Sequence, residues 1–588
     1  MFPLTIIEIT SIFLLFLCSA KIIFEKNGVR LVKIPFISLA LFIFLVLLQL
    51  IALPRGLLQY LSPGTAQLYL DFGFISMKNL TLSVYPDMTL GMLLQFLSYL
   101  AVFFVIINYF DTDEKVQRVI LVIIFSGFVY SFYGVIERFT IVGVEFSTFT
   151  NRNHFSAYIQ MIIPLAIGYS LTRRSVAIRS IFIFLASTML LALFLALSRA
   201  GIICIVLSLL ILAIILRMKY TLKKDAAIII LVVLLFSVLL GVFVGFDPTM
   251  QRLKTLVTPF QVLAIRLSLI KDTLSIFKDF PLWGVGLGVF GEIFQKYKSL
   301  GGAVETYSFA HNEPLQLIAE TGLLGFLSVT VFLFGYLKRI LHLLFKRRNL
   351  HVIYLSLGCL VGLTSIFLHS FFDFVFHIPA NALLFVIILA LINRILCIQQ
   401  KDKDPDEQEF KINLPQHLKV ISIIIFATLL LLVASLILNR YKAEQIFQSV
   451  KEIGPGIPKS DVIFTYRKKL KVLNKAITLN PLNSSYHNKK ADILSGLAVR
   501  DDLRVELLSF EEFGDTQRLL DIAGESYKRA IELNPTRADY HLRLGWFYGV
   551  TGENKLTKEE FNKAISLDPR NSRISTYVDE YFKESKAP

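Results

Sequence analysis

Long apolar stretches recur along the first three quarters of the chain, each about 20 residues long and almost free of charge. A stretch of that length matches the hydrocarbon thickness of a bilayer, so each one predicts a membrane-spanning helix. The pattern predicts an all-α, polytopic membrane domain over residues 1–438. Twelve spans are expected, at 2–20, 34–53, 90–110, 119–136, 155–172, 180–198, 200–216, 226–246, 321–337, 350–368, 378–396 and 420–438.

Basic residues between the predicted spans set the orientation of the chain. Alternate connections contain 23 Lys and Arg residues on one side of the bilayer, and the short connections on the other side contain five. Cytoplasmic loops are enriched in Lys and Arg, so the first set is expected to be cytoplasmic. Residues 2–20 are followed rather than preceded by basic residues, which favours a retained helix over a cleaved signal peptide. An even number of spans then places the N-terminus, the long loop 247–320 and the C-terminal region in the periplasm of a bacterial inner-membrane protein.

Composition supports the membrane assignment and excludes other classes. Of the 588 residues, 55% are apolar and only 18% charged, and mean hydropathy is +0.64, which excludes a soluble globular enzyme and a disordered chain. The net charge of +16 comes from short clusters between spans, with no basic stripe of interleaved aromatic residues. The expected partner of these charges is therefore the lipid bilayer and not a nucleic acid. The four cysteines lie within or at the end of apolar runs and indicate neither a disulfide framework nor a metal site.

A short pattern repeats in the polar C-terminal region, residues 439–588. The form Ala-Ile-x-Leu-Asn/Asp-Pro occurs at 476–481, 530–535 and 564–569, and the last two copies are 34 residues apart. That period is typical of tetratricopeptide repeats, in which each unit is a helical hairpin. We therefore predict a periplasmic, α-helical repeat domain. Because two or three such repeats are marginally stable alone, we expect the domain to pack on the membrane part or to bind an envelope protein.

Polar residues gather at the predicted outer ends of the spans, where they are candidates for function. One group is Asn151-Arg152-Asn153-His154, and a second is Arg199 in a very short outer turn. A third extends from Arg266 through a glycine-rich segment, 281–288, to His311, Asn312 and Glu320. The last contains His369, Asp373, His377 and Asn381. The spacing leaves open whether His154, His369 and Asp373 belong to a site or to its wall.

Two of these residue types suggest a particular chemistry. Arg199 and Arg266 are suited to clamping a diphosphate without a metal, since guanidinium groups bind phosphate oxygens in pairs and keep their charge. His311 is suited to act as general base because imidazole titrates near neutral pH. This combination fits glycosyl transfer from a lipid diphosphate. The alternatives are interfacial arginines that meet lipid headgroups and a histidine that makes a structural hydrogen bond.

Metal and cofactor sites are not expected. His311, His369 and His377 lack the spacing of a metal motif on one helix face, so no metal site is predicted. The segment Gly286-Leu-Gly-Val-Phe-Gly291 matches a dinucleotide-binding pattern, but no strand or βαβ unit surrounds it. No cofactor is therefore predicted.

The motifs in residues 145–400 resemble those of the O-antigen ligase and O-antigen polymerase superfamily. The resemblance rests on Asn151-Arg-Asn-His154, Ser198-Arg-Ala-Gly201, Arg266 with Pro281-Leu-Trp-Gly284, and His311-Asn312 followed by Glu320-Thr-Gly-Leu-Leu-Gly325. It implies a GT-C-like fold and a metal-independent, inverting glycosyltransferase that uses an undecaprenyl-diphosphate-linked glycan as donor. One departure is Glu313-Pro314, where the family more often has an acidic residue and then an aromatic or aliphatic one.

Roles are carried over by position. The resemblance implies that His311 activates the acceptor and that Arg199 and Arg266 hold the diphosphate. The other residues assigned to substrate binding are Asn312, Asn151, Arg152, Asn153, His154 and Glu320. The acceptor hydroxyl is expected on a lipid A-core, a second glycan or a protein, so polysaccharide polymerase and protein O-oligosaccharyltransferase are alternatives. A polysaccharide flippase and a repeat-based scaffold are the non-enzymatic alternatives. The polar groups gather at the outer face rather than within the spans, which favours the transferase over a flippase. A scaffold would need only one span as an anchor, and twelve are predicted.

Overall fold

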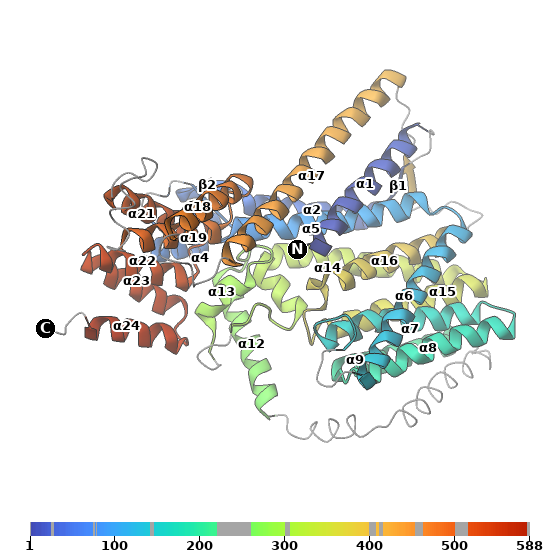
Figure 1. Cartoon of the computed structure of the whole chain (residues 1–588). Coiled ribbons are helices and arrows are strands. Elements are labelled where there is room, and N and C mark those ends of the chain that lie inside the picture. Colours follow the sequence, from blue (N-terminus) through green and yellow to red (C-terminus); the bar gives the residue numbers. More distant parts are fainter. Residues whose placement is uncertain are drawn as a thin grey trace.

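The computed structural model shows an almost entirely helical chain (Figure 1). It describes residues 2–24, 29–74, 77, 79–140, 146–219, 260–299, 306–398, 407–410, 415–452, 462–499 and 516–584. The predicted span at 226–246 and parts of the predicted loop 247–320 lie outside these residues.

Within the described residues, eight helices are long and apolar enough to cross a membrane. They are α1 (Phe2–Phe24), α5 (Pro86–Tyr109), α6 (Asp113–Thr140), α8 (Val176–Leu195), α14 (Glu313–Lys346), α15 (Leu350–His369), α16 (Pro379–Ile398) and α17 (Gln416–Glu452). Three other helices coincide with predicted spans: α2 (Lys33–Leu50), α7 (Arg152–Leu171) and α9 (Arg199–Lys219). The expectation of an all-α polytopic membrane protein is confirmed.

The shorter elements connect the spans at the two ends of the bundle. Between α2 and α5 are α3 (Arg55–Leu61) and α4 (Pro63–Phe72), and before α14 are α12 (Phe260–Asp279) and α13 (Phe290–Tyr297). A 3-10 turn, η2 (Val375–His377), joins α15 to α16. Two antiparallel strand pairs lie in the connections between helices: β1 (Val29–Val32) pairs with β4 (Glu407–Phe410), and β2 (Ala52–Pro54) pairs with β3 (Asn79–Thr81).

The main core of the membrane domain lies between α7, α8, α15 and α16. Helices α7 and α15 approach so closely that a Cβ on Gly362 would lie 2.4 Å from the carbonyl oxygen of Met161. At Gly358 the distance to the carbonyl oxygen of Pro164 would be 2.7 Å. Small residues at a helix crossing allow such contact, which is the usual basis of tight packing inside a bilayer. The polar N-terminus of α7 is thus held firmly beside the end of α15.

The C-terminal helices α18 to α24, which we call the repeat domain, lie at one end of the bundle (Figure 1). They are α18 (Val462–Leu479), α19 (Ser484–Ala498), α21 (Thr516–Leu533), α22 (Ala538–Val550), α23 (Asn554–Leu567) and α24 (Ser572–Glu584). The alanine that begins each repeated motif, at 476, 530 and 564, is fully buried between helices, as the repeat pattern predicts. Helix α17 continues through the predicted boundary at 438 into this region.

The repeat domain packs on the membrane domain through the asparagines of its motifs. Asn480 donates to the carboxylate of Asp87 at the start of α5, over 3.2 Å, and Arg440 forms an ion pair with the same carboxylate. Asn534 donates to the carboxylate of Glu292 on α13, over 2.8 Å. Leu567, in the third motif, joins the hydrophobic cluster of α4, α12 and α13. The domain therefore leans on the membrane part, one of the two expected arrangements.

Candidate functional site

A histidine–aspartate pair lies at the centre of the polar outer residues. Nδ1 of His311 is 2.9 Å from Oδ1 of Asp373, and since an ionised carboxylate only accepts, Nδ1 carries the proton. The His311 side chain is 36% exposed, whereas that of Asp373 is only 2% exposed. In the neutral form of the accessible imidazole, this geometry leaves Nε2 as the unprotonated nitrogen, which is the state a general base requires.

The electrostatics keep Asp373 ionised. Burial by itself raises the pKa of this carboxyl, but the hydrogen bond and charge of His311 and the donors of Phe374 and Asn153 outweigh burial and lower the pKa to about 2. The backbone N–H of Phe374 donates to Oδ1 over 2.9 Å. The amide of Asn153 donates to Oδ2 over 2.8 Å. A carboxylate held in this way fixes the tautomer and orientation of the imidazole.

The segment that carries His311 is fastened to the turn between α15 and α16. His311 itself has a positive φ of 50°, a strained conformation for a non-glycine residue that the surrounding contacts must maintain. Asn312 caps α14 by accepting from the N–H of Leu315, and its amide donates to the carbonyl of Phe371 over 3.0 Å. The rings of Phe309 and Phe374 stack with centroids 4.2 Å apart. The position of the imidazole is therefore defined by contacts on both sides.

Glu313 and Pro314, the departure from the family pattern, have a clear structural place. Pro314 occupies the first turn of α14, where its missing N–H costs nothing. The carboxylate of Glu313 accepts from the N–H of Phe376 over 2.7 Å and pairs with Nδ1 of His377 at 3.1 Å. Burial by itself lowers the pKa of His377, but Glu313 and Glu320 together raise it to about 9. His377 thus ties the start of α14 to η2.

The N-terminus of α7 completes the wall behind Asp373. Asn151 caps the helix by accepting from the N–H of Asn153 over 2.8 Å, which directs Asn153 to Asp373. His154 is buried, and its ring meets that of Phe374 edge-on at 4.8 Å. The structure therefore brings Asn151, Asn153 and His154 to the His311–Asp373 pair, although Asn153 and Asp373 are 220 residues apart along the chain.

Four buried polar atoms near this wall have no hydrogen-bond partner among the described residues: Nε2 of His154, Oε1 of Gln160, Nε2 of His369 and Oδ1 of Asn381. Their residues are linked to one another, because Gln160 donates to Nδ1 of His369 and Asn381 donates to the carbonyl of His154. Unpaired buried groups are costly, so a lining of this kind favours ordered water. His154, His369 and Asn381 are all buried in this wall.

Glu320 lies away from the accessible imidazole and organises the glycine-rich segment. Its buried carboxylate accepts from the N–H groups of Gly288 and Phe290, at 2.8 and 3.4 Å. Helix α14 is kinked at Gly322, whose φ of 64° and ψ of −171° suit only glycine. A Cβ there would lie 2.3 Å from the carbonyl carbon of Leu282. The Glu-x-Gly motif therefore locks the segment 281–290 against α14.

The arginines lie on the surface around this centre. Arg199 is the first residue of α9 and is exposed, and the next turn packs on α7, where a Cβ on Gly201 would lie 2.7 Å from Cβ of Ser156. Arg152, at the start of α7, is partly exposed. Arg266, on α12, is exposed, and its charge acts electrostatically on His369. Arg199 and Arg266 are thus exposed to solvent, and Arg152 is exposed in part.

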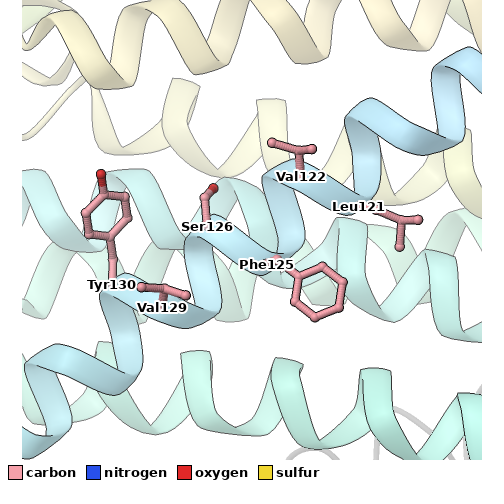
Figure 2. A pocket seen from close by; sticks show the side chains of 6 residues that line it. All are labelled: Leu121, Val122, Phe125, Ser126, Val129 and Tyr130. Atoms are coloured by element: carbon pink, nitrogen blue, oxygen red, sulfur yellow. The ribbon is translucent and has the colours of Figure 1, made fainter.

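Helix α6 carries an exposed apolar face. Figure 2 shows the six side chains that line a shallow hollow of about 520 Å³ there: Leu121, Val122, Phe125, Ser126, Val129 and Tyr130. Val122 and Val129 are 68% and 59% exposed. An exposed apolar helix face of this kind is the surface that a bilayer covers.

Sequence reasoning did not assign Asp373 to the pair or Glu313 to its support. Asp373 was noted beside His369 in an outer turn, but only a contact across 62 residues gives it a role. An acidic residue in an outer connection without Lys or Arg was the available signal. Among the described residues, no group of three or more His, Cys, Asp or Glu side chains could hold a metal ion.

Comparison with known proteins bears on part of the chain. Residues 184–330 match the family described as O-antigen ligase, so the resemblance drawn from the motifs is confirmed over this segment. The segment contains Arg199, Arg266, His311, Asn312 and Glu320 but ends before Asp373. The chain is also 30% identical over 79 residues to the type IV pilus assembly protein PilF of Pseudomonas aeruginosa. That similarity covers 13% of this chain and 30% of PilF.

Proposed function

We propose that the chain is a membrane glycosyltransferase that moves a glycan from undecaprenyl diphosphate to an acceptor hydroxyl, in the synthesis of cell-envelope polysaccharide. The observation that carries the proposal is the pair of His311 and Asp373 at 2.9 Å, with His311 inside the O-antigen ligase segment. An accessible imidazole backed by a buried carboxylate is the arrangement that activates a hydroxyl group.

His311 is the base in this proposal. Its Nε2 takes the proton of the acceptor hydroxyl as the oxygen attacks the anomeric carbon of the donor sugar. Asp373 remains ionised and stabilises the imidazolium that forms, because its pKa of about 2 lies far below neutral pH. Asn153 and the N–H of Phe374 are positioning groups, since they act on Asp373 and not on the sugar.

The exposed arginines stabilise the leaving group. As the bond from the anomeric carbon to the phosphate oxygen breaks, its electron pair passes to the diphosphate, which Arg199 and Arg266 neutralise. Attack from the face opposite the diphosphate inverts the anomeric centre. The residues supply acid–base and electrostatic catalysis themselves, so the proposed reaction is independent of a metal.

The setting of the reaction is part of the same proposal. The excess of basic residues on one side of the membrane supports a bacterial inner-membrane location, with the site and the repeat domain in the periplasm. The chain divides into a membrane domain over 1–438 and a tetratricopeptide-like domain over 439–588. An envelope protein is the candidate partner of the repeats.

A glycan analysis of the host envelope tests the proposal. Cells that carry the wild type, His311→Ala or the control His487→Ala are compared; His487 lies on α19 and bonds to the carbonyl of Pro481, outside the site. Loss of transfer in His311→Ala alone supports the proposal, and glycan missing from lipid A or from protein identifies the acceptor. Single repeat units left on the carrier indicate a polymerase instead, and an unchanged profile contradicts the role of His311.

A further inference from the structure

Helix α18, the first helix of the repeat domain, carries an unusual excess of positive charge. It contains five basic residues and no acidic one, and α19 adds Lys489 and Lys490 against a single acidic residue, Asp492. Lys468, Lys471 and Lys475 follow one another at intervals of three and four, so they lie on one face of the helix. We call these three residues the lysine stripe.

The lysine stripe is exposed and is not neutralised by the described part of the chain. All three side chains are exposed, while the opposite face of α18, with Leu470, Leu473 and Ala476, is buried against α17 and α19. None of the three forms an ion pair or hydrogen bond with a described residue. Burial and the charge of Lys489 also lower the pKa of the neighbouring Lys469, a sign of crowded positive charge. An anionic ligand would relieve this repulsion.

The contacts of Asp87 show how the stripe is directed. Asp87 is the second residue of the membrane-spanning α5, and both Arg440 of α17 and Asn480, just after α18, bind it. Helices α17 and α18 therefore run antiparallel, with Arg440 and Asn480 at the membrane end. At about 1.5 Å per residue, Lys475 lies up to about 8 Å from Asn480 along the helix and Lys468 up to about 18 Å.

The direction of the lysine stripe helps to identify the class of anion that it binds. Charges attract lipid headgroups only within about 8 Å in physiological salt, and Lys468 lies farther than that from the membrane end of α18. Between Leu438 and Val499, no described large apolar side chain is exposed, although protein interfaces depend on such anchors. A surface that offers charge alone, in a line leading away from the membrane, fits a flexible polyanion.

We propose that the lysine stripe binds an acidic glycan, one with uronate or phosphate groups along its chain. The inference rests on the proposed function, because a glycan transferred at the His311 site extends from the membrane into the compartment that holds α18. It adds the substrate class: the transferred polysaccharide is anionic, and the stripe guides it near its membrane-bound end.

Binding of polymers to the full-length protein in phosphatidylcholine nanodiscs tests the inference. The probes are fluorescent oligogalacturonate, a uronate polymer, and neutral dextran of equal length. We expect oligogalacturonate to bind in a salt-sensitive manner and dextran not to bind. The variant Lys468→Gln/Lys471→Gln/Lys475→Gln should bind oligogalacturonate at least about tenfold more weakly. The control Lys555→Gln/Lys558→Gln, with two exposed lysines of α23, should bind as the wild type does.

Three results would overturn the inference. Equal binding by the triple variant and the control means that the stripe does not hold the glycan. Stripe-dependent binding of phosphatidylglycerol vesicles that exceeds that of oligogalacturonate identifies the membrane as the ligand, and the same result with polyglutamate identifies an acidic protein.

His311→Ala should bind oligogalacturonate normally. Retained binding in this variant, together with unchanged transfer, would reject the proposed catalytic site while leaving the stripe intact.

Discussion

The contact of Asn534 with Glu292 links the repeat domain to the loop of His311. Glu292 lies in the first turn of α13, next to Gly291, where a Cβ would lie 3.0 Å from Cα of Ser308. Gln295, one turn later, donates to the carbonyl of Tyr307 over 3.3 Å. Helix α13 thus supports the residues that lead into His311, with contacts at Tyr307 and Ser308. Asn534→Ala removes one of the contacts by which the repeat domain supports α13.

The expected magnitude follows from the bond that is lost. Asn534 is fully buried and its amide donates to a carboxylate over 2.8 Å, and hydrogen bonds to charged groups contribute about 1.5–3 kcal/mol. The remaining partner of Glu292, Arg537 at 3.7 Å, is 44% exposed and contributes less than about 1 kcal/mol. If about 2 kcal/mol is lost at the His311 loop, transfer falls up to about 30-fold.

Asn480→Ala is the matched control, because it removes the asparagine of the first motif from Asp87, on α5 rather than α13. The assay measures kcat and KM with purified full-length protein across pH, together with the thermal stability of each variant. We expect both variants to lose stability, but only Asn534→Ala to lose kcat and to shift the pH profile. Equal activity losses, or an unchanged kcat in a destabilised Asn534→Ala, would refute the reasoning.

Three other predictions concern the supports of the site. Gly322→Ala should destabilise the protein by about 1–3 kcal/mol, because the backbone conformation at this position suits only glycine. The control Gly496→Ala, with open space around it on α19, should instead raise stability by about 0.5–1 kcal/mol. Equal melting temperatures of the two variants would contradict this prediction. The raised pKa of His377 means that its stabilisation is complete below about pH 6.5 and is lost as the pH rises through about 9. A melting curve of His377→Gln should show less of this alkaline loss than the wild type, and an identical pH dependence would disprove the assignment. Prolonged EDTA treatment should leave transfer unchanged, and a loss restored by a divalent cation would contradict metal independence.

The helices of the described residues follow from local patterns, and for that reason the sequence predicts them well. Apolar length alone identifies helices such as α5 and α16, and the spacing of Ala530 and Ala564 places buried positions that recur in each hairpin. These features depend on residues that are near one another in the chain.

The organisation of the site depends on distant contacts that no local pattern reveals. Topology counting placed His311 and Asp373 on the same side of the membrane, but their pairing arises from the packing of α15 against α7 and the fastening of Glu313 to η2. The motif around Glu320 can be recognised in the sequence, but its structural role cannot. Only the structure shows that the Glu320 carboxylate accepts a hydrogen bond from the N–H of Gly288.

The rate of transfer by purified His311→Ala, measured in a single turnover with saturating lipid-linked donor, tests the central claim most directly. The account predicts a loss of at least about 100-fold relative to the wild type, with unchanged folding and with normal activity in His487→Ala. A rate within twofold of the wild type would contradict the role of His311 as the base.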